Sequence, residues 1–353
     1  MVTMKDVAAA AGVSQASVSY AYSGSPRVSA TQREHIFTVA ASLGYTGPNI
    51  AGSSLRLGRI GAVGVLIPGS LALAVEDPST MLLMKGIVEV GELADVALTL
   101  LPVDPQPGAD GPVKSAVLRG LVDGVVMHTI ADDHPVVDAV RARKIPAVAI
   151  DSPRVANLPY VTVDHLQAGA QQMNHVLELG HKRIGVITDR IGTTASPGFR
   201  YWADVESSHE TYLRERLAGY RQAMSAHRVR LADIALVEAA GIDMASGRRA
   251  AELLIGEFAP TAIVATSDVH AVASLQALSA QGVGVPEAVS VIGFDDAPIA
   301  DLVGLTTVRQ PLEDKGRTAA KILLDLIAGR PRRRSIKATE LIVRSTTGPA
   351  PGS

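Results

Sequence analysis

The chain has 353 residues, 47% of them hydrophobic, enough for two or three domains with sizeable cores, and no apolar run is long enough to span a membrane. It contains no cysteine, which excludes disulfide bonds and thiol-based metal or redox sites. The net charge of −2 is unevenly spread, because residues 1–59 carry five basic and two acidic side chains, a net +3 that leaves −5 for the rest. Unless it is chance scatter, this basic excess fits phosphate contact by one end of the chain.

Three short helices are predicted within the first 46 residues. Thr3 can cap the first helix, Gly12 can form a tight turn, and Ser14 can cap the second helix. A third helix is predicted to begin at Ser29. This pattern is typical of a helix-turn-helix domain that reads the DNA major groove. No apolar block like that of a signal peptide precedes these helices, so a cytoplasmic location is expected.

A linker is predicted over residues 47–59. Pro48 disfavours a helical conformation in the residue before it, and the segment that follows is short and weakly helical. The sequence therefore separates a head, residues 1–46, from a body that begins at residue 60.

The body alternates between short apolar strands and amphipathic helices, a pattern that predicts parallel sheets covered by helices. Strands are predicted at residues 60–68, 97–101, 124–127, 147–151, 183–188, 235–238, 262–265, 289–293 and 339–344. Helices are predicted at residues 79–94, 113–120, 135–144, 166–179, 213–226, 246–257, 269–281 and 318–328. We expect two doubly wound α/β subdomains, one formed by residues 60–163 with 312–330 and the other by residues 164–311 with 331–353.

The head resembles that of the LacI/GalR family of bacterial transcription regulators, and further matches extend across nearly the whole remaining chain. The matching residues of the head and linker are Asp6-Val7-Ala8, Ala11-Gly12-Val13-Ser14, Val18-Ser19, Val28-Ser29, Thr31, Arg33, Leu43-Gly44-Tyr45 and Pro48-Asn49. The resemblance implies an all-α helix-turn-helix head on a body with the type I periplasmic-binding-protein fold, which this family uses to sense small molecules.

DNA contacts are expected from the start of the second helix. Gln15 can offer its amide to adenine, and Ala16 can touch a thymine methyl group. Tyr20 lies one turn further on, where the family often has an arginine suited to guanine. Tyr20 either contacts a base or a phosphate, or it packs on the third helix. The full set of predicted DNA-binding residues is Thr3, Ser14, Gln15, Ala16, Ser17, Tyr20, Ser29, Asn49 and Leu55.

In the resembled family the linker folds into a hinge helix on operator DNA and inserts a leucine into the minor groove, a place that Leu55 occupies here. The alternative is a flexible linker whose Leu55 packs on the body. The chain departs from the family pattern at Gly52, where alanine is common and where glycine lowers helix stability by about 1 kcal/mol.

Four residues of the body match family positions that bind the effector: Asp151, Arg216, Ser267 and Asp295. Two carboxylates and a guanidinium suit a polyhydroxylated ligand, because carboxylates accept hydrogen bonds from hydroxyl groups and arginine donates them. Asp295 could instead cap the loop that follows it, and Arg216 could form a surface salt bridge with Glu215 or another nearby acid. Serine at position 267, where many relatives have asparagine, puts the usual sugar pose in doubt.

The segment 191–209 is longer than in the family and contains Phe199, Tyr201 and Trp202, the only tryptophan. It is either a lid or stacking wall over the effector, with Trp202 as a contact, or a surface loop pinned by its own aromatic residues.

The sequence thus predicts a ligand-responsive transcription regulator, most simply a repressor that binds a pseudo-palindromic operator as a homodimer. Its partners would be double-stranded DNA and a sugar- or nucleoside-like effector, with no membrane contact. No catalytic residues, metal ligands or cofactor are predicted, since no acid/base set or metal-binding motif is visible. The alternatives from other classes are a small-molecule-binding protein with the same body and an enzyme with a doubly wound fold.

Overall fold

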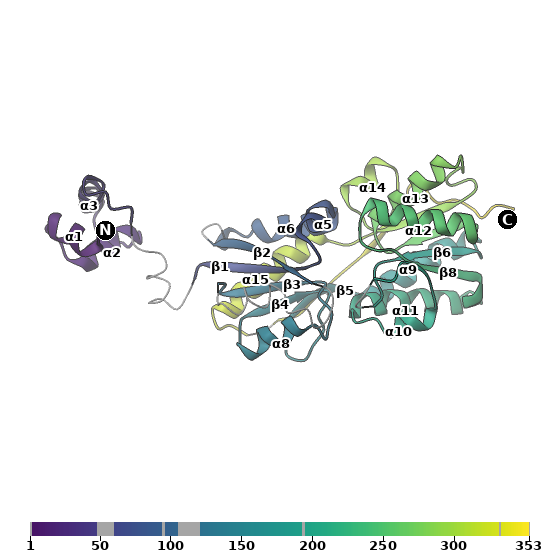
Figure 1. Ribbon diagram of the computed structural model, residues 1–353, viewed down its shortest axis with the longest axis horizontal. Helices are drawn as coiled ribbons and strands as arrows, with labels where there is room; N and C mark the ends of the chain where they lie inside the picture. Colours follow the sequence, from purple (N-terminus) through teal and green to yellow (C-terminus); the bar gives the residue numbers. More distant parts are fainter. Residues whose placement is uncertain are drawn as a thin grey trace. The chain divides into compact units, whose positions relative to one another are not determined.

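The computed structural model describes residues 2–47, 60–93, 96–104, 121–192, 195–331 and 333–352. The chain divides into two compact units, Met1–Gly61 and Ala62–Ser353 (Figure 1). The predicted helix at residues 113–120 and most of the predicted linker, including Asn49 and Leu55, lie outside the described residues.

The first unit contains the three predicted helices, α1 (Met4–Ala10), α2 (Gln15–Tyr22) and α3 (Ala30–Ser42). Thr3 and Asp6 form a reciprocal capping box at the start of α1, and Gly12 makes the turn before α2 with a φ of 63°. The helices enclose a small core of aliphatic side chains. That core consists of Val7, Ala8, Ala11, Val18, Ala21, Val28, Ile36 and Ala40. The helix-turn-helix fold of the head is therefore confirmed.

The second unit contains two sheets, each covered by helices on both faces (Figure 1). The first sheet has the order β12-β5-β4-β3-β1-β2, and its neighbouring strands pair in parallel. Its strands are β1 (Ala62–Pro68), β2 (Ala97–Val103), β3 (Gly124–His128), β4 (Ala147–Ile150), β5 (Tyr160–Val163) and β12 (Ser335–Lys337). Its helices are α5 (Leu71–Glu76), α6 (Pro78–Val88), α8 (Pro135–Ala142) and α15 (Leu312–Ile327), with a short 3₁₀ turn at Gly91–Leu93.

The second sheet has the order β13-β11-β10-β9-β6-β8-β7, with antiparallel pairing only at its two edges. Its strands are β6 (Ile184–Thr188), β7 (Gly198–Arg200), β8 (Ile234–Glu238), β9 (Ala262–Ala265), β10 (Ser290–Asp295), β11 (Thr306–Arg309) and β13 (Glu340–Ile342). Its helices are α9 (His165–Glu178), α10 (Trp202–Glu206), α11 (Thr211–Ala226), α12 (Met244–Glu257), α13 (Asp268–Ala280) and α14 (Pro298–Leu302), with a 3₁₀ turn at Leu231–Asp233.

Alternation along the central strands explains why both faces of each sheet are covered. Val125 and Met127 of β3 pack in the core beneath α8, whereas Val126 between them packs in the core beneath α6 and α15. Side chains of successive strand residues point to opposite faces, so an apolar run such as β3 buries two cores at once. The two doubly wound subdomains expected from the sequence are confirmed.

The chain passes between the two sheets three times, at residues 163–165, 309–312 and 337–340. The predicted boundary at residue 331 is wrong, because residues 335–337 form β12, which pairs with β5 at the edge of the first sheet. This strand has only three residues, and the basic residues before it give no strand pattern. Helix α15 begins at Leu312, earlier than the predicted start at residue 318.

Candidate functional site

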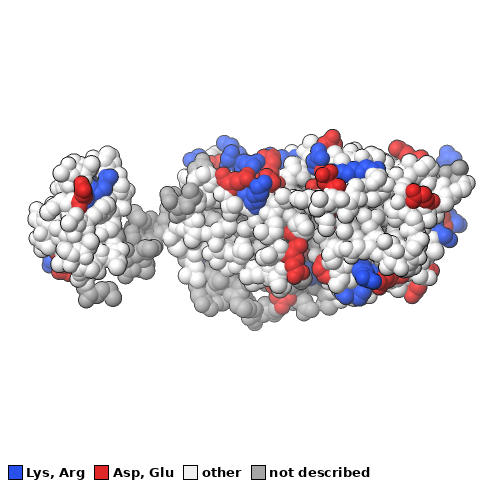
Figure 2. Space-filling view, turned by 90° about the horizontal axis from the view of Figure 1, so that it is seen from above, with Lys and Arg blue, Asp and Glu red and all other residues white. Residues whose placement is uncertain are grey.

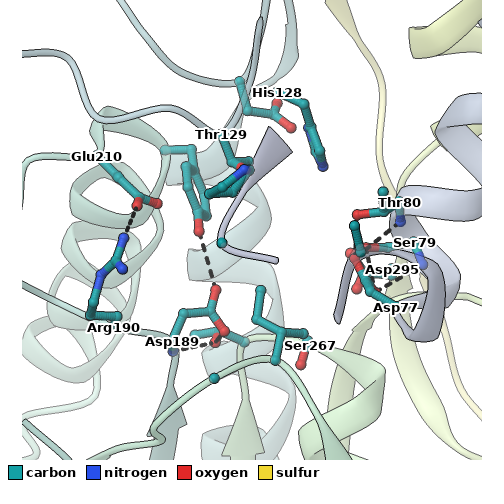
Figure 3. Close-up of a pocket in the computed structure, with 18 of the residues that line it drawn as sticks. Asp77, Ser79, Thr80, His128, Thr129, Asp189, Arg190, Glu210, Ser267 and Asp295 are labelled. Carbon is teal, nitrogen blue, oxygen red and sulfur yellow. Dashed lines mark hydrogen bonds and ion pairs between the residues drawn. The ribbon is translucent and has the colours of Figure 1, made fainter. Parts of the chain in front are cut away.

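A cavity of about 230 Å³ lies between the two halves of the body, at the carboxyl ends of their parallel strands (Figure 3). Ligands of open α/β sheets bind at these ends. The first half contributes Ile67, Pro68, Gly69, Ala74, Asp77, Ser79, Thr80, His128, Thr129 and Asp151. The second half and a crossing segment contribute Asp189, Arg190, Glu210, Tyr212, Arg216, Ala240, Gly241, Ile242, Thr266, Ser267, Asp295, Gln310 and Leu312. The structure thus brings together four predicted site residues, Asp151, Arg216, Ser267 and Asp295.

Asp151 follows β4 and has both carboxylate oxygens bonded within the protein. Oδ1 accepts hydrogen bonds of 3.0 Å from Thr162 Oγ1 and from His165 Nε2. Oδ2 accepts from Nζ of Lys315, a fully buried lysine on α15 that also donates to Gln310 Oε1 at 2.7 Å. Burial alone raises the pKa of Asp151, but Lys315 and His165 hold it well below the usual range. Asp151 is therefore ionised, and its neighbours bond to both of its oxygens.

Arg216 is buried in α11, so the alternative of a surface salt bridge is wrong. Its Nη1 donates to the carbonyl oxygen of Thr266 at 2.5 Å, and its guanidinium carbon lies 3.4 Å from the centre of the Phe294 ring. Glu215 instead faces Arg154, with 3.6 Å between their charged atoms. The structure orients the guanidinium with a carbonyl and an aromatic face rather than with an acid.

His165 connects Arg216 to Asp151. Nη2 of Arg216 lies 3.2 Å from Nδ1 of His165, and because arginine can only donate, Nδ1 must accept and the ring proton sits on Nε2, which faces Asp151. Burial lowers the pKa of His165 to about 4, so this imidazole is neutral.

Helices α9 and α11, which carry His165 and Arg216, lie in close contact. This contact depends on Gly169 and Gly219, where any side chain would overlap with backbone of the facing helix.

Asp295 closes this network from the other side. It ends β10 with a φ of 127°, and its Oδ1 accepts a 2.5 Å hydrogen bond from Nε2 of Gln310. Burial, with Asp268 nearby, raises the pKa of Asp295 well above its usual range. The predicted alternative, a cap on the next loop, belongs instead to Asp268, which accepts from the amide of Ala297 at 2.7 Å.

Ser267 caps α13, because its hydroxyl accepts a hydrogen bond from the amide of His270 at 3.3 Å.

Across the cavity, Arg190 lies 3.5 Å from Glu210. Burial raises the pKa of Glu210 to about 7, against the opposing effect of that arginine. Asp189 accepts from the hydroxyl of Tyr212 at 3.2 Å. Acidic side chains therefore outnumber basic ones among the described residues of the lining, and both arginines contact protein atoms.

Trp202 does not line the cavity, so its predicted role as an effector contact is wrong. It is 9% exposed, packs in the core beneath α10 and α11, and donates through Nε1 to the carbonyl oxygen of Ile234 at 3.4 Å. The other two aromatic residues of the segment are exposed, Phe199 at 44% and Tyr201 at 81%. Residues 198–200 of the segment form β7, an edge strand paired with β8.

Sequence reasoning missed several residues of the cavity. His128 and Asp189 directly follow strands that were predicted, so the rule that ligands bind at the carboxyl ends of strands could have found them. Asp77 and Glu210, which line the cavity, and Lys315 behind it carry no comparable signal, since each is placed by a helix packed against a sheet.

In the head, Gln15 and Ala16 are exposed on the first turn of α2, as a base-reading role requires. Thr3, Ser14 and Ser29 cap the three helices, and Ser17 lies beside Ser14 with 2.9 Å between their hydroxyls. Their DNA contacts stay predictions.

Tyr20 is half-buried against the core of the head, and its hydroxyl accepts a 2.8 Å hydrogen bond from Nη1 of Arg27. Few charged side chains are visible on the face of the head that Figure 2 shows.

Among the residues that the structure describes, no helix is long and apolar enough to cross a membrane. No group of three or more His, Asp or Glu side chains in those ranges could hold a metal ion.

Comparison with known proteins identifies the family. Residues 3–49 match the family model described as bacterial regulatory proteins, lacI family, and residues 173–347 match that of a periplasmic binding protein-like domain. An HTH-type transcriptional regulator of Mycolicibacterium smegmatis is 34% identical, over 98% of this chain and 96% of the relative. A LacI-family transcriptional regulator of Corynebacterium glutamicum superposes with a TM-score of 0.77 at 28% identity, covering 97% of this chain and 98% of that one. The regulator CelR in complex with cellobiose superposes with a TM-score of 0.66 at 26% identity, covering 98% and 100%. The chain belongs to the LacI family of bacterial regulatory proteins.

Proposed function

We propose that this protein is a cytoplasmic, non-enzymatic repressor that binds a pseudo-palindromic operator as a homodimer and responds to an uncharged, polyhydroxylated effector. The head, residues 1–46, would read the major groove, and residues 47–59 would form the hinge on DNA. The observation that carries the proposal is the buried network from Arg216 through His165, Asp151, Lys315 and Gln310 to Asp295, which spans both halves of the body beside the cavity.

The charges of the cavity favour an uncharged effector. Among the described residues that line the cavity, five are acidic and only Arg190 and Arg216 are basic, and Arg190 lies beside Glu210, so a phosphate or carboxylate group would meet more acidic side chains than basic ones. Hydroxyl groups, by contrast, can donate to the carboxylates and accept from the remaining guanidinium hydrogens. The bound cellobiose of the similar CelR structure supports a sugar-like ligand.

The response would be a shift between two arrangements of the body. A ligand that touches both halves binds the arrangement that brings those halves together more tightly than the other. The three crossing segments are the natural hinges, and the 309–312 crossing carries Gln310 into the network. A change of only a few kcal/mol in that equilibrium is enough to alter operator occupancy strongly.

The test is selection of bound DNA from a random pool, repeated with a mixed library of sugars and nucleosides and with the phosphorylated sugars. An enriched palindrome whose recovery changes with a neutral sugar or nucleoside supports the proposal. A response only to phosphorylated compounds would overturn the uncharged effector, and failure to enrich any sequence would overturn the DNA-binding function.

A further inference from the structure

Arg27 is a tethered cation beside the second helix of the head. Its Nη1 donates to the hydroxyl of Tyr20 at 2.8 Å, and its guanidinium carbon lies 5.2 Å from the centre of the Tyr20 ring. The arginine itself is exposed, whereas the tyrosine is half-buried in the core of the head. A side chain fixed by the core thus holds the guanidinium in place while most of its donors stay free.

The helix geometry places this guanidinium next to the predicted reading face. Ala16 and Tyr20 are four residues apart in α2, so they lie on the same side of the helix. Ala16 is exposed on that side, and the hydrogen bond to the Tyr20 hydroxyl holds the Arg27 guanidinium one helical turn further along α2. Arg27 therefore stands where a base edge would be met if α2 lies in the major groove.

The other two positive side chains of residues 2–47 are placed differently. Nη2 of Arg33 donates to the carbonyl oxygen of Ser25 at 2.9 Å, which gives that arginine a structural role within the head. Lys5 lies on α1, beside the acidic member of the capping box. Arg27 is the cation of these three that is both exposed and held at α2.

We propose that Arg27 reads a guanine in the major groove and that Tyr20 is the positioning residue that holds its guanidinium for this contact. Guanine presents two acceptors there, N7 and O6, which match the paired donors of an arginine. The hydrogen bond to Tyr20 reduces the freedom that the long side chain would lose on binding, and so favours a base contact over a loosely held phosphate contact. This inference rests on the proposed DNA-binding function.

The test uses the full chain and the palindrome enriched by the wild-type protein. Arg27→Ala is expected to lose the preference for one G·C pair in each half-site, a discrimination of about 10- to 100-fold, while the other positions keep theirs. At that guanine, 7-deazaguanine lacks the N7 acceptor. It should weaken wild-type binding several-fold and leave Arg27→Ala binding unchanged.

Two tyrosine variants separate positioning from structure. Tyr20→Phe removes only the hydroxyl and should reduce discrimination at the same base pair several-fold. Tyr22→Phe is the matched control in the same helix, since the Tyr22 ring packs edge-on against Phe37 and Tyr45, and it should leave every base preference intact. Circular dichroism and thermal unfolding should be the same for both variants.

Contrary outcomes are distinct from failure of the proposed function. If Arg27→Ala binds all sequences more weakly by the same factor, and a neutral methylphosphonate linkage reproduces that loss, Arg27 contacts phosphate and the inference is wrong. If Arg27→Ala keeps full affinity and every base preference, Arg27 does not touch DNA. A wild-type protein that enriches no sequence would instead remove the DNA-binding function itself.

Discussion

Nζ of Lys315 lies 2.5 Å from Oδ2 of Asp151, and this ion pair is buried, joining helix α15 to the end of strand β4. Thr162 and His165 occupy the other carboxylate oxygen. Asp151 lines the cavity, and both its oxygens are already bonded within the protein, so it also holds His165 and, through it, Arg216. Asp295 and Glu210, whose carboxyl groups have raised pKa values, are the acids whose hydrogen bonding a ligand can change most easily.

Lys315→Met is expected to lower the free energy of unfolding by about 3–5 kcal/mol, because removing one partner of a buried pair leaves the other charge uncompensated. The double variant Lys315→Met with Asp151→Asn should recover much of that loss, since neither charge of the pair remains. Urea unfolding of both variants measures this, with Lys321→Met, an exposed lysine on the same helix, as the control. A double variant no more stable than Lys315→Met would show that the loss comes from packing and not from charge.

Asp295→Asn is expected to weaken effector binding about 10- to 100-fold while operator affinity without ligand changes less than about twofold. A buried polar group left without its hydrogen-bond partner costs about 1–3 kcal/mol, and the amide keeps the shape of the carboxyl group. Titration of operator-bound protein with the selected sugar or nucleoside measures both quantities. Asp301→Asn, on an exposed carboxylate of α14, is the matched control, and an Asp295 variant with a full ligand response would show that the cavity is misassigned.

Leu55→Ala is expected to weaken binding to the operator much more than binding to random DNA. The sequence places Leu55 where a minor-groove wedge would act, and a wedge stabilises only the kinked, specific complex. Binding titrations on both DNAs at one salt concentration measure the ratio. Equal losses on operator and random DNA would exclude the wedge.

The sequence predicted the cavity residues that lie at the ends of strands better than those that tertiary packing brings to the site. Asp151 ends a predicted strand, and Ser267 and Asp295 each lie two residues beyond the end of one, so their convergence at one edge follows from the parallel topology. Lys315 could not be foreseen, because a lysine in an amphipathic helix normally faces solvent and only tertiary packing buries it. Trp202 was wrongly predicted to contact the effector, because aromatic residues pack in cores as often as they line ligand sites. In a short segment, no periodicity distinguishes the two roles.

Trp202 provides a direct check of that correction. Trp202→Phe should cost about 1–3 kcal/mol of unfolding free energy, since a buried ring is replaced by a smaller one, and should leave the effector Kd unchanged. Because Trp202 is the only tryptophan, its fluorescence in the wild-type protein should report unfolding of the second half and change little on ligand binding. Strong quenching by the ligand, together with weaker effector binding by the variant, would support the interpretation of this segment as a lid over the effector.

Glu210 should make stability depend on pH. Burial raises its pKa to about 7 from a reference value of 4.5, so the folded state holds the proton more tightly than the unfolded state does. The stability from this group is fully present below pH 4.5 and is lost as the pH rises to about 7, by up to about 3 kcal/mol. Across this pH range, the free energy of unfolding measured with urea should therefore fall more steeply for the wild type than for Glu210→Gln, whose amide cannot ionise.

Asp268, whose pKa is also raised to about 7, titrates in both proteins, so the difference between the two curves isolates Glu210. Glu206→Gln, on an exposed side chain paired with Arg221, should follow the wild type, and parallel curves for wild type and Glu210→Gln would mean that Glu210 is already ionised in the folded protein.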